Sequence, residues 1–271
     1  MGLDIAPLWD FGRPEASEQR FREALQKATG DDALILQTQI ARSHGLRGNF
    51  TTARQVLGSI KPGIAAAGFE ARTRYELELG RTFASATHPP EARTRENQEL
   101  ARKHYEAALA IAREGKLDGL AIDAIHMLAF VDTAPADQLK WGRAALAVVE
   151  ASSQPAAKRW EGSVRNNIGV ALHKLGRYEE ALEEFRRALA IRERDGNAQS
   201  VRIAHWMVAW TLRALDRIDE ALAIQLRLER ENEAAGTPDR HVFEELEALY
   251  RAKGDAARAS AYAARKSAAK R

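Results

Sequence analysis

Apolar residues recur every three or four positions along most of the chain, with charged residues between them. This spacing places the apolar side chains on one face of an α-helix, and runs of strict alternation, typical of β-strands, are absent from the sequence. Most prolines lie between the periodic segments, at Pro14, Pro62, Pro89, Pro90, Pro135, Pro155 and Pro238. The pattern predicts an all-α protein.

The most regular segment runs from residue 162 to residue 195. Small residues at Gly169 and Ala181 allow two helices to approach closely, and Gly176 suits a sharp turn between them. The apolar positions are Ile168, Leu172, Tyr178 and Phe185, and Ala188 is a further small residue facing the next hairpin. This unit resembles the tetratricopeptide repeat (TPR), a helical hairpin of about 34 residues.

Related patterns recur on both sides of this unit. Ala53, Ala101, Ala221 and Ala259 lie at positions equivalent to Ala181, whereas the third hairpin matches least well because it has His126 and Gln138 where small residues are expected. The resemblance therefore implies a right-handed α-α superhelix, a TPR solenoid of about six helix hairpins that forms one domain over residues 1–271. We expect the first helices of the hairpins near 33–46, 67–86, 118–131, 157–175, 198–215 and 239–253, with a loop at 87–92.

The two ends of the predicted solenoid need caps, since an end repeat lacks a neighbour on one side. Residues 1–32 are expected to form an N-terminal cap with a lone helix near 15–29, closed by Trp9, Phe11 and Phe21. The repeats then occupy residues 33–254, and residues 255–271, rich in Ala, Lys and Arg, form a C-terminal capping helix.

Composition limits the classes of function. The 41 Lys and Arg nearly balance the 38 Asp and Glu, giving a net charge of +3, which does not indicate a dedicated nucleic-acid binder. The chain has no cysteine, and it shows neither the pattern of a secretory signal nor an apolar run of membrane-spanning length. We therefore expect a cytoplasmic protein that binds neither nucleic acid nor membrane. The sequence does not indicate its oligomeric state.

Motifs for catalysis are absent from the sequence. It has no Gly-rich phosphate loop, no Gly-x-Ser-x-Gly turn and no His-Glu-x-x-His helix, and its seven histidines never lie three or four residues apart. The acidic runs alternate with arginines, as in solvent-exposed helical charge pairs. We expect no catalytic residue, no metal site and no cofactor.

In the TPR family, recurring positions of each first helix line a concave groove, which binds partner proteins. Those positions here are Arg42, Arg74, Arg81, Met127, Phe130, Asn166, His173, Lys174, Trp206, Trp210, Arg213 and Arg251. The basic residues outnumber the acids at groove positions, Asp123 and Glu244, which favours an acidic peptide or a free C-terminal carboxylate. The alternative is that the arginines solvate helix faces or pair with glutamates on neighbouring repeats.

Trp206 and Trp210 are four residues apart and therefore share one helix face. In the groove they would anchor a partner, because Trp and Arg are enriched at binding hot spots. The alternative is that they pack between adjacent first helices. The carboxylate clamp of chaperone-tail-binding TPR proteins uses Lys and Asn four residues apart on one first helix, Asn on the next, and Lys and Arg four residues apart on the third. This pattern is broken here, because Val170 follows Asn166 and Trp206 follows Arg202 at that spacing.

Together these features predict a non-enzymatic scaffold or adaptor that binds a segment of another protein in a basic, Trp-containing groove. The alternative is a peptide-sensing regulatory receptor of the bacterial TPR quorum-sensing type, which would lack the DNA-binding domain that such receptors usually carry.

Overall fold

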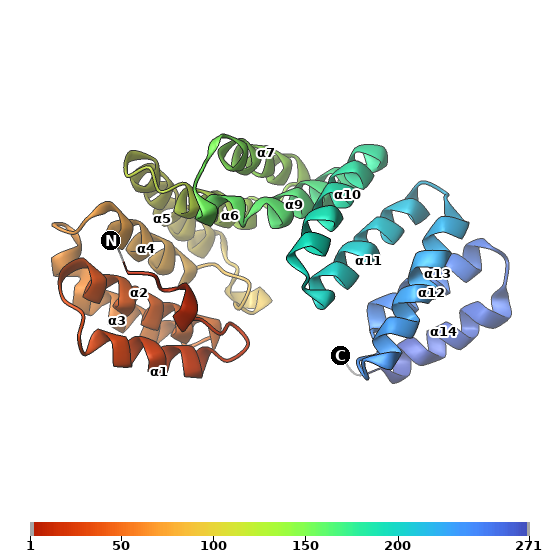
Figure 1. The fold of residues 1–271 in the computed structure, drawn as a ribbon, viewed down its shortest axis with the longest axis horizontal. Helices are drawn as coiled ribbons and strands as arrows, with labels where there is room; N and C mark the ends of the chain where they lie inside the picture. Colours follow the sequence, from red (N-terminus) through yellow and green to blue (C-terminus); the bar gives the residue numbers. More distant parts are fainter. Residues whose placement is uncertain (1–2, 270–271) are drawn as a thin grey trace. The chain divides into compact units, whose positions relative to one another are not determined.

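The computed structural model describes residues 3–269 (Figure 1). The described residues contain α-helices and two short 3-10 helices, and no β-strand lies among them. In the N-terminal part the elements are η1 (Ala6–Leu8), α1 (Pro14–Leu25), α2 (Gly30–Leu46), α3 (Phe50–Ile64), α4 (Phe69–Arg81), η2 (Pro90–Ala92), α5 (Arg95–Glu114), α6 (Asp118–Val131), α7 (Pro135–Ala151) and α8 (Pro155–Lys158). They are followed by α9 (Glu161–Lys174), α10 (Tyr178–Asp195), α11 (Ala198–Ala214), α12 (Ile218–Ala234), α13 (Arg240–Ala252) and α14 (Ala256–Ala268).

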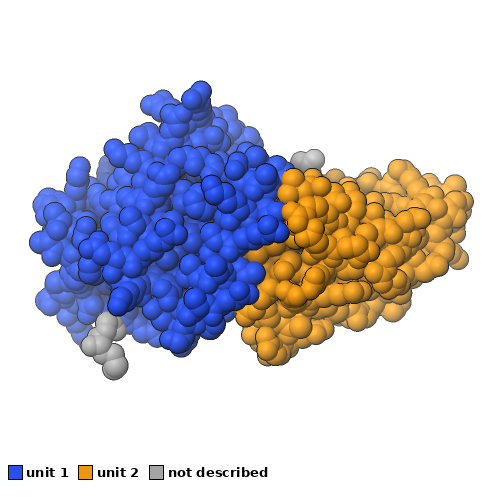
Figure 2. All heavy atoms as spheres, turned by 90° about the horizontal axis from the view of Figure 1, so that it is seen from above, with its two compact units in different colours: residues 1–160 blue, residues 161–271 orange. Residues whose placement is uncertain are grey.

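The chain divides into two compact units, residues 1–160 and residues 161–271, which Figure 2 colours separately. In unit 1, α2 packs on α3, α4 on α5 and α6 on α7, and the first helices α2 and α4 also pack on each other. In unit 2, α9 packs on α10, α11 on α12 and α13 on α14. These pairs are the predicted helix hairpins. That both units belong to a single domain stays a prediction.

Four of the hairpins turn at a residue with a left-handed backbone: Gly48, Gly176, Asp216 and Gly254. Gly176, between α9 and α10, has φ +73°, a conformation that costs glycine little because it has no Cβ. In the hairpin of α11 and α12 the same position is occupied by Asp216, whose φ is +58°. The turn geometry is therefore kept even where the sequence does not supply glycine, at the cost of local backbone strain.

Close approach of the two helices explains the small residues of the repeat. A Cβ added to Gly169 would lie 2.7 Å from the ring of Phe185, and one added to Gly80 would lie 2.6 Å from the ring of Tyr105. Both rings are fully buried. A glycine on the first helix thus receives an aromatic ring from the second, which confirms the role predicted for Gly169.

Two predicted helices are shorter than expected. The helix predicted at 67–86 ends at Arg81. The backbone N–H groups of Thr82 and Phe83 bond to the carbonyl oxygens three residues earlier, those of Leu79 and Gly80, so the last turn has 3-10 rather than α-helical geometry. The ring of His88 then folds the following loop back, with its Nε2 3.1 Å from the Thr82 carbonyl oxygen. The helix predicted at 157–175 is interrupted, since α8 ends at Lys158 and α9 begins at Glu161.

Pro62 does not mark a boundary between helices, contrary to the sequence interpretation. It lies in the last turns of α3, which continues to Ile64.

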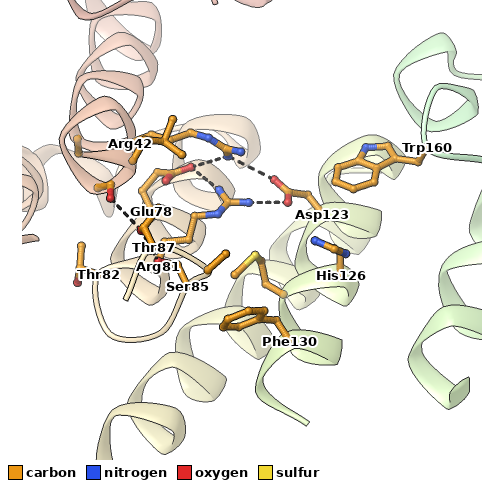
Figure 3. A pocket seen from close by; sticks show the side chains of 15 residues that line it. Arg42, Glu78, Arg81, Thr82, Ser85, Thr87, Asp123, His126, Phe130 and Trp160 are labelled. Atoms are coloured by element: carbon orange, nitrogen blue, oxygen red, sulfur yellow. Dashed lines mark hydrogen bonds and ion pairs between the residues drawn. The ribbon is translucent and has the colours of Figure 1, made fainter. Parts of the chain in front are cut away.

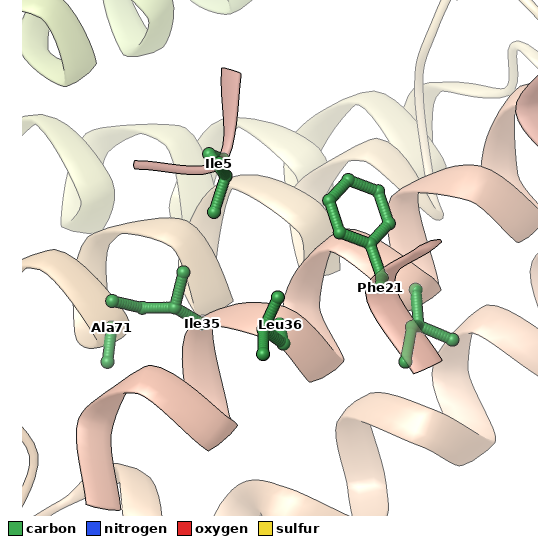
Figure 4. Close-up of a cluster of buried hydrophobic side chains, with 6 residues drawn as sticks. Ile5, Phe21, Ile35, Leu36 and Ala71 are labelled. Atoms are coloured by element: carbon green, nitrogen blue, oxygen red, sulfur yellow. The ribbon is translucent and has the colours of Figure 1, made fainter. Parts of the chain in front are cut away.

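The N-terminal end is closed by aromatic and aliphatic side chains. Trp9 packs edge-on against Phe21 and stacks face to face on Phe11. Ile5, Phe21, Ile35, Ile40, Leu36 and Ala71 form one buried cluster (Figure 4). At the other end, the guanidinium of Arg265 lies 4.3 Å from the ring centroid of Phe243 on α13, so that α14 packs over the last first helix.

Candidate binding site

A hollow of about 220 Å³ lies in unit 1 between α2, α4, α6 and the loop that follows α4 (Figure 3). Four of the predicted groove residues line it: Arg42, Arg81, Met127 and Phe130. The remaining lining residues include Glu78, Ser85, Ala86, Thr87, Asp123, His126 and Trp160. The first helices of three successive hairpins therefore form one continuous surface that lines the hollow.

Four charged side chains form a cluster at the floor of this hollow (Figure 3). Arg81 donates 2.5 Å hydrogen bonds to Glu78 on its own helix and to Asp123 on α6. Arg42 on α2 donates to Glu78 at 3.2 Å and lies 3.8 Å from Asp123. The two guanidiniums and two carboxylates balance in charge and connect α2, α4 and α6.

Burial and mutual attraction act in opposite directions on these groups. Burial alone would raise the pKa of Asp123, but the guanidiniums of Arg81 and Arg42 outweigh it and hold that pKa below its ordinary value. Burial would lower the pKa of Arg81, yet Asp123 and Glu78 raise it. Neighbouring His126 has a lowered pKa because it is buried, although Asp123 opposes the shift. At neutral pH Asp123 and Arg81 are therefore charged, and the imidazole of His126 beside them is neutral.

The four side chains of the cluster differ in their exposure to solvent. The side chain of Glu78 is 3% exposed, those of Arg81 and Asp123 are each 12% exposed, and that of Arg42 is 25% exposed. Arg42 is thus the member most accessible to a ligand, and it can donate hydrogen bonds to a carboxylate or carbonyl oxygen. Met127 and Phe130 add an apolar wall.

The other predicted groove residues do not line this hollow. Arg74 pairs with Glu70 on its own helix at 2.9 Å. In unit 2, the Arg213 guanidinium makes two bonds to Glu245 on α13, at 2.8 and 2.9 Å. Six other predicted groove residues belong to the same unit: Asn166, His173, Lys174, Trp206, Trp210 and Arg251.

Unit 2 carries a row of aromatic rings across its first helices. His173 on α9 stacks on Trp210 with centroids 3.3 Å apart, and Trp210 stacks on Trp206 at 5.8 Å. Trp206 in turn meets His241 on α13 edge-on at 6.3 Å. The structure therefore brings the two tryptophans together with a histidine from each neighbouring hairpin.

Both tryptophans are partly buried, and Trp206 also packs against the core cluster that contains Leu228 and Val242. They thus combine a partly exposed surface with packing between first helices. The pKa of His173 is lowered to about 4, first by burial and then by the nearby charge of Arg213, so this imidazole is neutral at physiological pH.

Sequence reasoning gave pairing with glutamates on neighbouring repeats as the alternative, but it did not identify the acidic partners of the arginines. Glu78 and Glu247 precede Arg81 and Arg251 by three and four residues, and they pair with them at 2.5 and 2.6 Å. That i, i+3 and i, i+4 spacing was the available signal. Glu245, the partner of Arg213, is on another helix and left no such local signal.

The described part of the chain has no group of three or more His, Cys, Asp or Glu side chains suited to a metal ion. Between residues 3 and 269, no helix is both long and apolar enough to cross a membrane.

Comparison with known proteins finds a family match for part of the chain. Residues 160–230 match the tetratricopeptide repeat family, and the helix hairpins on both sides have the same form. The stretch from α9 into α12 is therefore similar to tetratricopeptide repeats. No curated protein sequence matches it.

Solved structures with a similar fold include the signal-transduction ATPase (STAND) protein with a tetratricopeptide-repeat sensor from Pyrococcus horikoshii. The TM-score is 0.71 at 15% identity, and the match covers 94% of this chain but only 39% of that protein. The apo form of RapI matches with a TM-score of 0.66 at 11% identity, over 93% of this chain and 68% of RapI. The apo quorum sensor NprR from B. thuringiensis matches with a TM-score of 0.52 at 14% identity, over 95% and 82%. At these identities the likeness concerns the fold.

Proposed function

We propose that this chain is a non-catalytic binding module that holds a segment of a partner protein or peptide in the hollow of unit 1. The observation that supports the proposal is the lining itself. Three successive first helices contribute a charged floor and an apolar wall to one hollow of about 220 Å³. A concave surface that combines apolar side chains with polar groups able to orient a ligand is the usual form of a binding site.

The chemistry of the floor favours a partner with an acidic side chain or a free carboxylate. Arg42 is the most exposed member of the cluster, and its two carboxylate neighbours are the more buried Glu78 and Asp123. A partner carboxylate would meet the guanidinium first. Because the cluster as a whole is neutral, we expect selection by hydrogen-bond geometry at Arg42 rather than by a broad positive potential.

The aromatic row of unit 2 would provide a second contact surface, with Trp206 and Trp210 as anchors. A cytoplasmic location and the absence of nucleic-acid binding remain predictions of the sequence.

The test is to block the hollow without altering the cluster. Ala86 is exposed on the loop that lines the hollow, and Ala86→Arg would fill the mouth with a long side chain. Ala110→Arg is the matched control, since Ala110 is exposed on α5 and does not line the hollow. Proteins from a lysate of the source cells would be cross-linked to each variant and quantified by mass spectrometry. Partners captured by wild type and the control, but not by Ala86→Arg, are expected; equal capture by all three would refute the proposal.

The alternative function is a peptide-sensing receptor. It is favoured by the descriptions of two similar structures, one as a sensor and one as a quorum sensor. The two functions differ in ligand size. A receptor should bind peptides that pass an ultrafiltration membrane, and an adaptor should bind intact proteins from the retained fraction.

A further inference from the structure

The segment before α1 lies on the same face of α2 that leads into the hollow. We call residues 3–11 the N-terminal strap. Ile35, Gln39 and Arg42 follow one another at intervals of four and three residues, so they share one face of α2. The strap contacts all three, and the ribbon in Figure 1 shows it crossing α2 before α1 begins.

Contacts between strap and helix face are specific. Ile5 is 8% exposed and packs with Ile35 of α2 and Ala71 of α4 (Figure 4). The indole Nε1 of Trp9 donates a 3.1 Å hydrogen bond to Oε1 of Gln39. The strap, which includes the 3-10 turn η1, thus occupies the first-helix face as a short bound peptide would.

Arg42 of α2 contacts the strap and also lines the hollow. Its Cζ lies 5.8 Å from the ring centroid of Trp9 and 5.7 Å from that of Phe11. The Nη1 of the same guanidinium reaches Glu78 in the floor of the hollow. Its Nε is buried without a hydrogen-bond partner among the described residues. A ligand that approaches Arg42 from the hollow therefore reaches a guanidinium that the rings of Trp9 and Phe11 already contact.

The strap is held less firmly than the helices beneath it. Ile5 is its one buried side chain among residues 3–11, and the ring of Phe11 is 60% exposed. Its firmest attachment to α1 lies at its end, where the backbone N–H of Asp10 donates to Ser17 Oγ at 2.7 Å and the same hydroxyl donates back to the Asp10 carbonyl oxygen. Closer to its start, Arg20 of α1 donates to the Leu8 carbonyl oxygen at 3.3 Å and Phe21 packs against Trp9. Residues 3–9 can lift while Asp10 stays anchored by breaking these two side-chain contacts, without unfolding α1 or α2.

We propose that the N-terminal strap is an internal occupant of the α2 end of the binding site, and that a partner reaching Arg42 displaces Trp9 from it. The strap lays the rings of Trp9 and Phe11 against Arg42, whereas its Asp4 and Asp10 bond to Ala6 and Arg13. A competing partner therefore presents an aromatic side chain to Arg42, and an acidic group beside it would accept hydrogen bonds from the guanidinium. The proposal rests on the proposed function only in assigning the hollow to a partner; the release and rebinding of the strap are independent of it.

The first experiment uses a fluorescent synthetic peptide of residues 3–13 as the probe. In the full-length variant Ile5→Ser/Trp9→Ala, the strap is loosened and its face on α2 becomes free. The peptide should bind this variant saturably, and bind wild type at least about tenfold more weakly, because the strap competes at a high effective concentration. A peptide carrying Trp9→Ala is the control and should not bind. Equal binding to both proteins, or none to a folded variant, would overturn the proposal.

A second experiment needs no variant. Hydrogen exchange at the indole Nε1–H of Trp9 reports opening of the strap, and that of Trp141, bonded to Asp132 Oδ2 at 2.8 Å, is the matched control in unit 1. In wild type the Trp9 indole should exchange at least about tenfold faster than the Trp141 indole while the amides of α2 remain protected. Equal rates would show that the strap does not open separately. Because neither experiment uses the Ala86→Arg capture assay, the strap and the proposed function can fail independently.

Discussion

The charged cluster of unit 1 predicts a large loss of stability for Asp123→Asn. This substitution keeps the shape of the side chain but removes the charge that faces Arg81 and Arg42. Arg81 would retain Glu78 and lose its second carboxylate, inside a site where its side chain is 12% exposed. Leaving a buried charge without its partner costs about 3–5 kcal/mol, and the remaining Glu78 places the expected cost near 3 kcal/mol.

Thermal unfolding followed by circular dichroism measures this cost. For a unit of 160 residues, about 3 kcal/mol corresponds to a fall in Tm of about 6–12 °C. The control is Glu99→Gln, which removes the partner of Arg95 in an exposed pair whose side chains are 61% and 92% exposed. That change should leave Tm nearly unaltered, because exposed ion pairs contribute little. A shift for Asp123→Asn as small as that of the control would refute the account of the cluster.

The pH dependence gives a second check on Asp123. Its pKa is lower in the folded protein than in the unfolded chain, so its contribution is complete above the ordinary aspartate pKa of about 4. The contribution is lost as pH falls through the folded pKa. The difference in Tm between wild type and Asp123→Asn should therefore be constant near neutral pH and shrink in acid; a constant difference down to acid pH would show that the charge is not its cause.

Three further predictions concern other parts of the fold. Asp216→Gly should stabilise unit 2 by up to about 1 kcal/mol in urea unfolding, because glycine adopts the left-handed turn without strain; a loss of stability would contradict this. Gly80→Ala should destabilise unit 1 by about 1 kcal/mol or more in the same assay, since overpacking against the buried ring of Tyr105 outweighs the helix propensity gained; an increase would show that the ring can move. His173, with a pKa of about 4, should stay predominantly neutral by NMR between pH 7 and pH 5. Its contribution to stability should be complete above its ordinary pKa of about 6.5 and be lost as pH falls toward 4. Titration near 6.5 in the folded protein would refute its burial.

The helix hairpins were predictable from the sequence because their signals are local. The small residue at Gly169, the turn at Gly176 and the apolar spacing around Phe185 each act within one hairpin, and the structure places them as expected. The end of α4 was not predictable, because Thr82 and the residues after it continue an acceptable helical pattern. That helix stops where the ring of His88, six residues further on, bonds to the Thr82 carbonyl oxygen.

The candidate site was predictable only in part. Arg42, Arg81, Met127 and Phe130 were identified from their positions in the repeat, and they do line one hollow. The pairing of Arg42 with Glu78, 36 residues away, depends on how α2 packs on α4, which a single sequence does not contain. Charge counted along the sequence therefore overstated the free positive charge at the site.

The loop after α4 gives the hollow a property that the helices alone could not. Ser85, Ala86 and Thr87 contribute to its wall, and they belong to an insertion rather than to the stacked helices. Insertions in helical repeats can vary in length and sequence without disturbing the stacking of the hairpins. Relatives of this chain could therefore acquire different ligands by exchanging this one loop, with the scaffold and its buried charges left as they are.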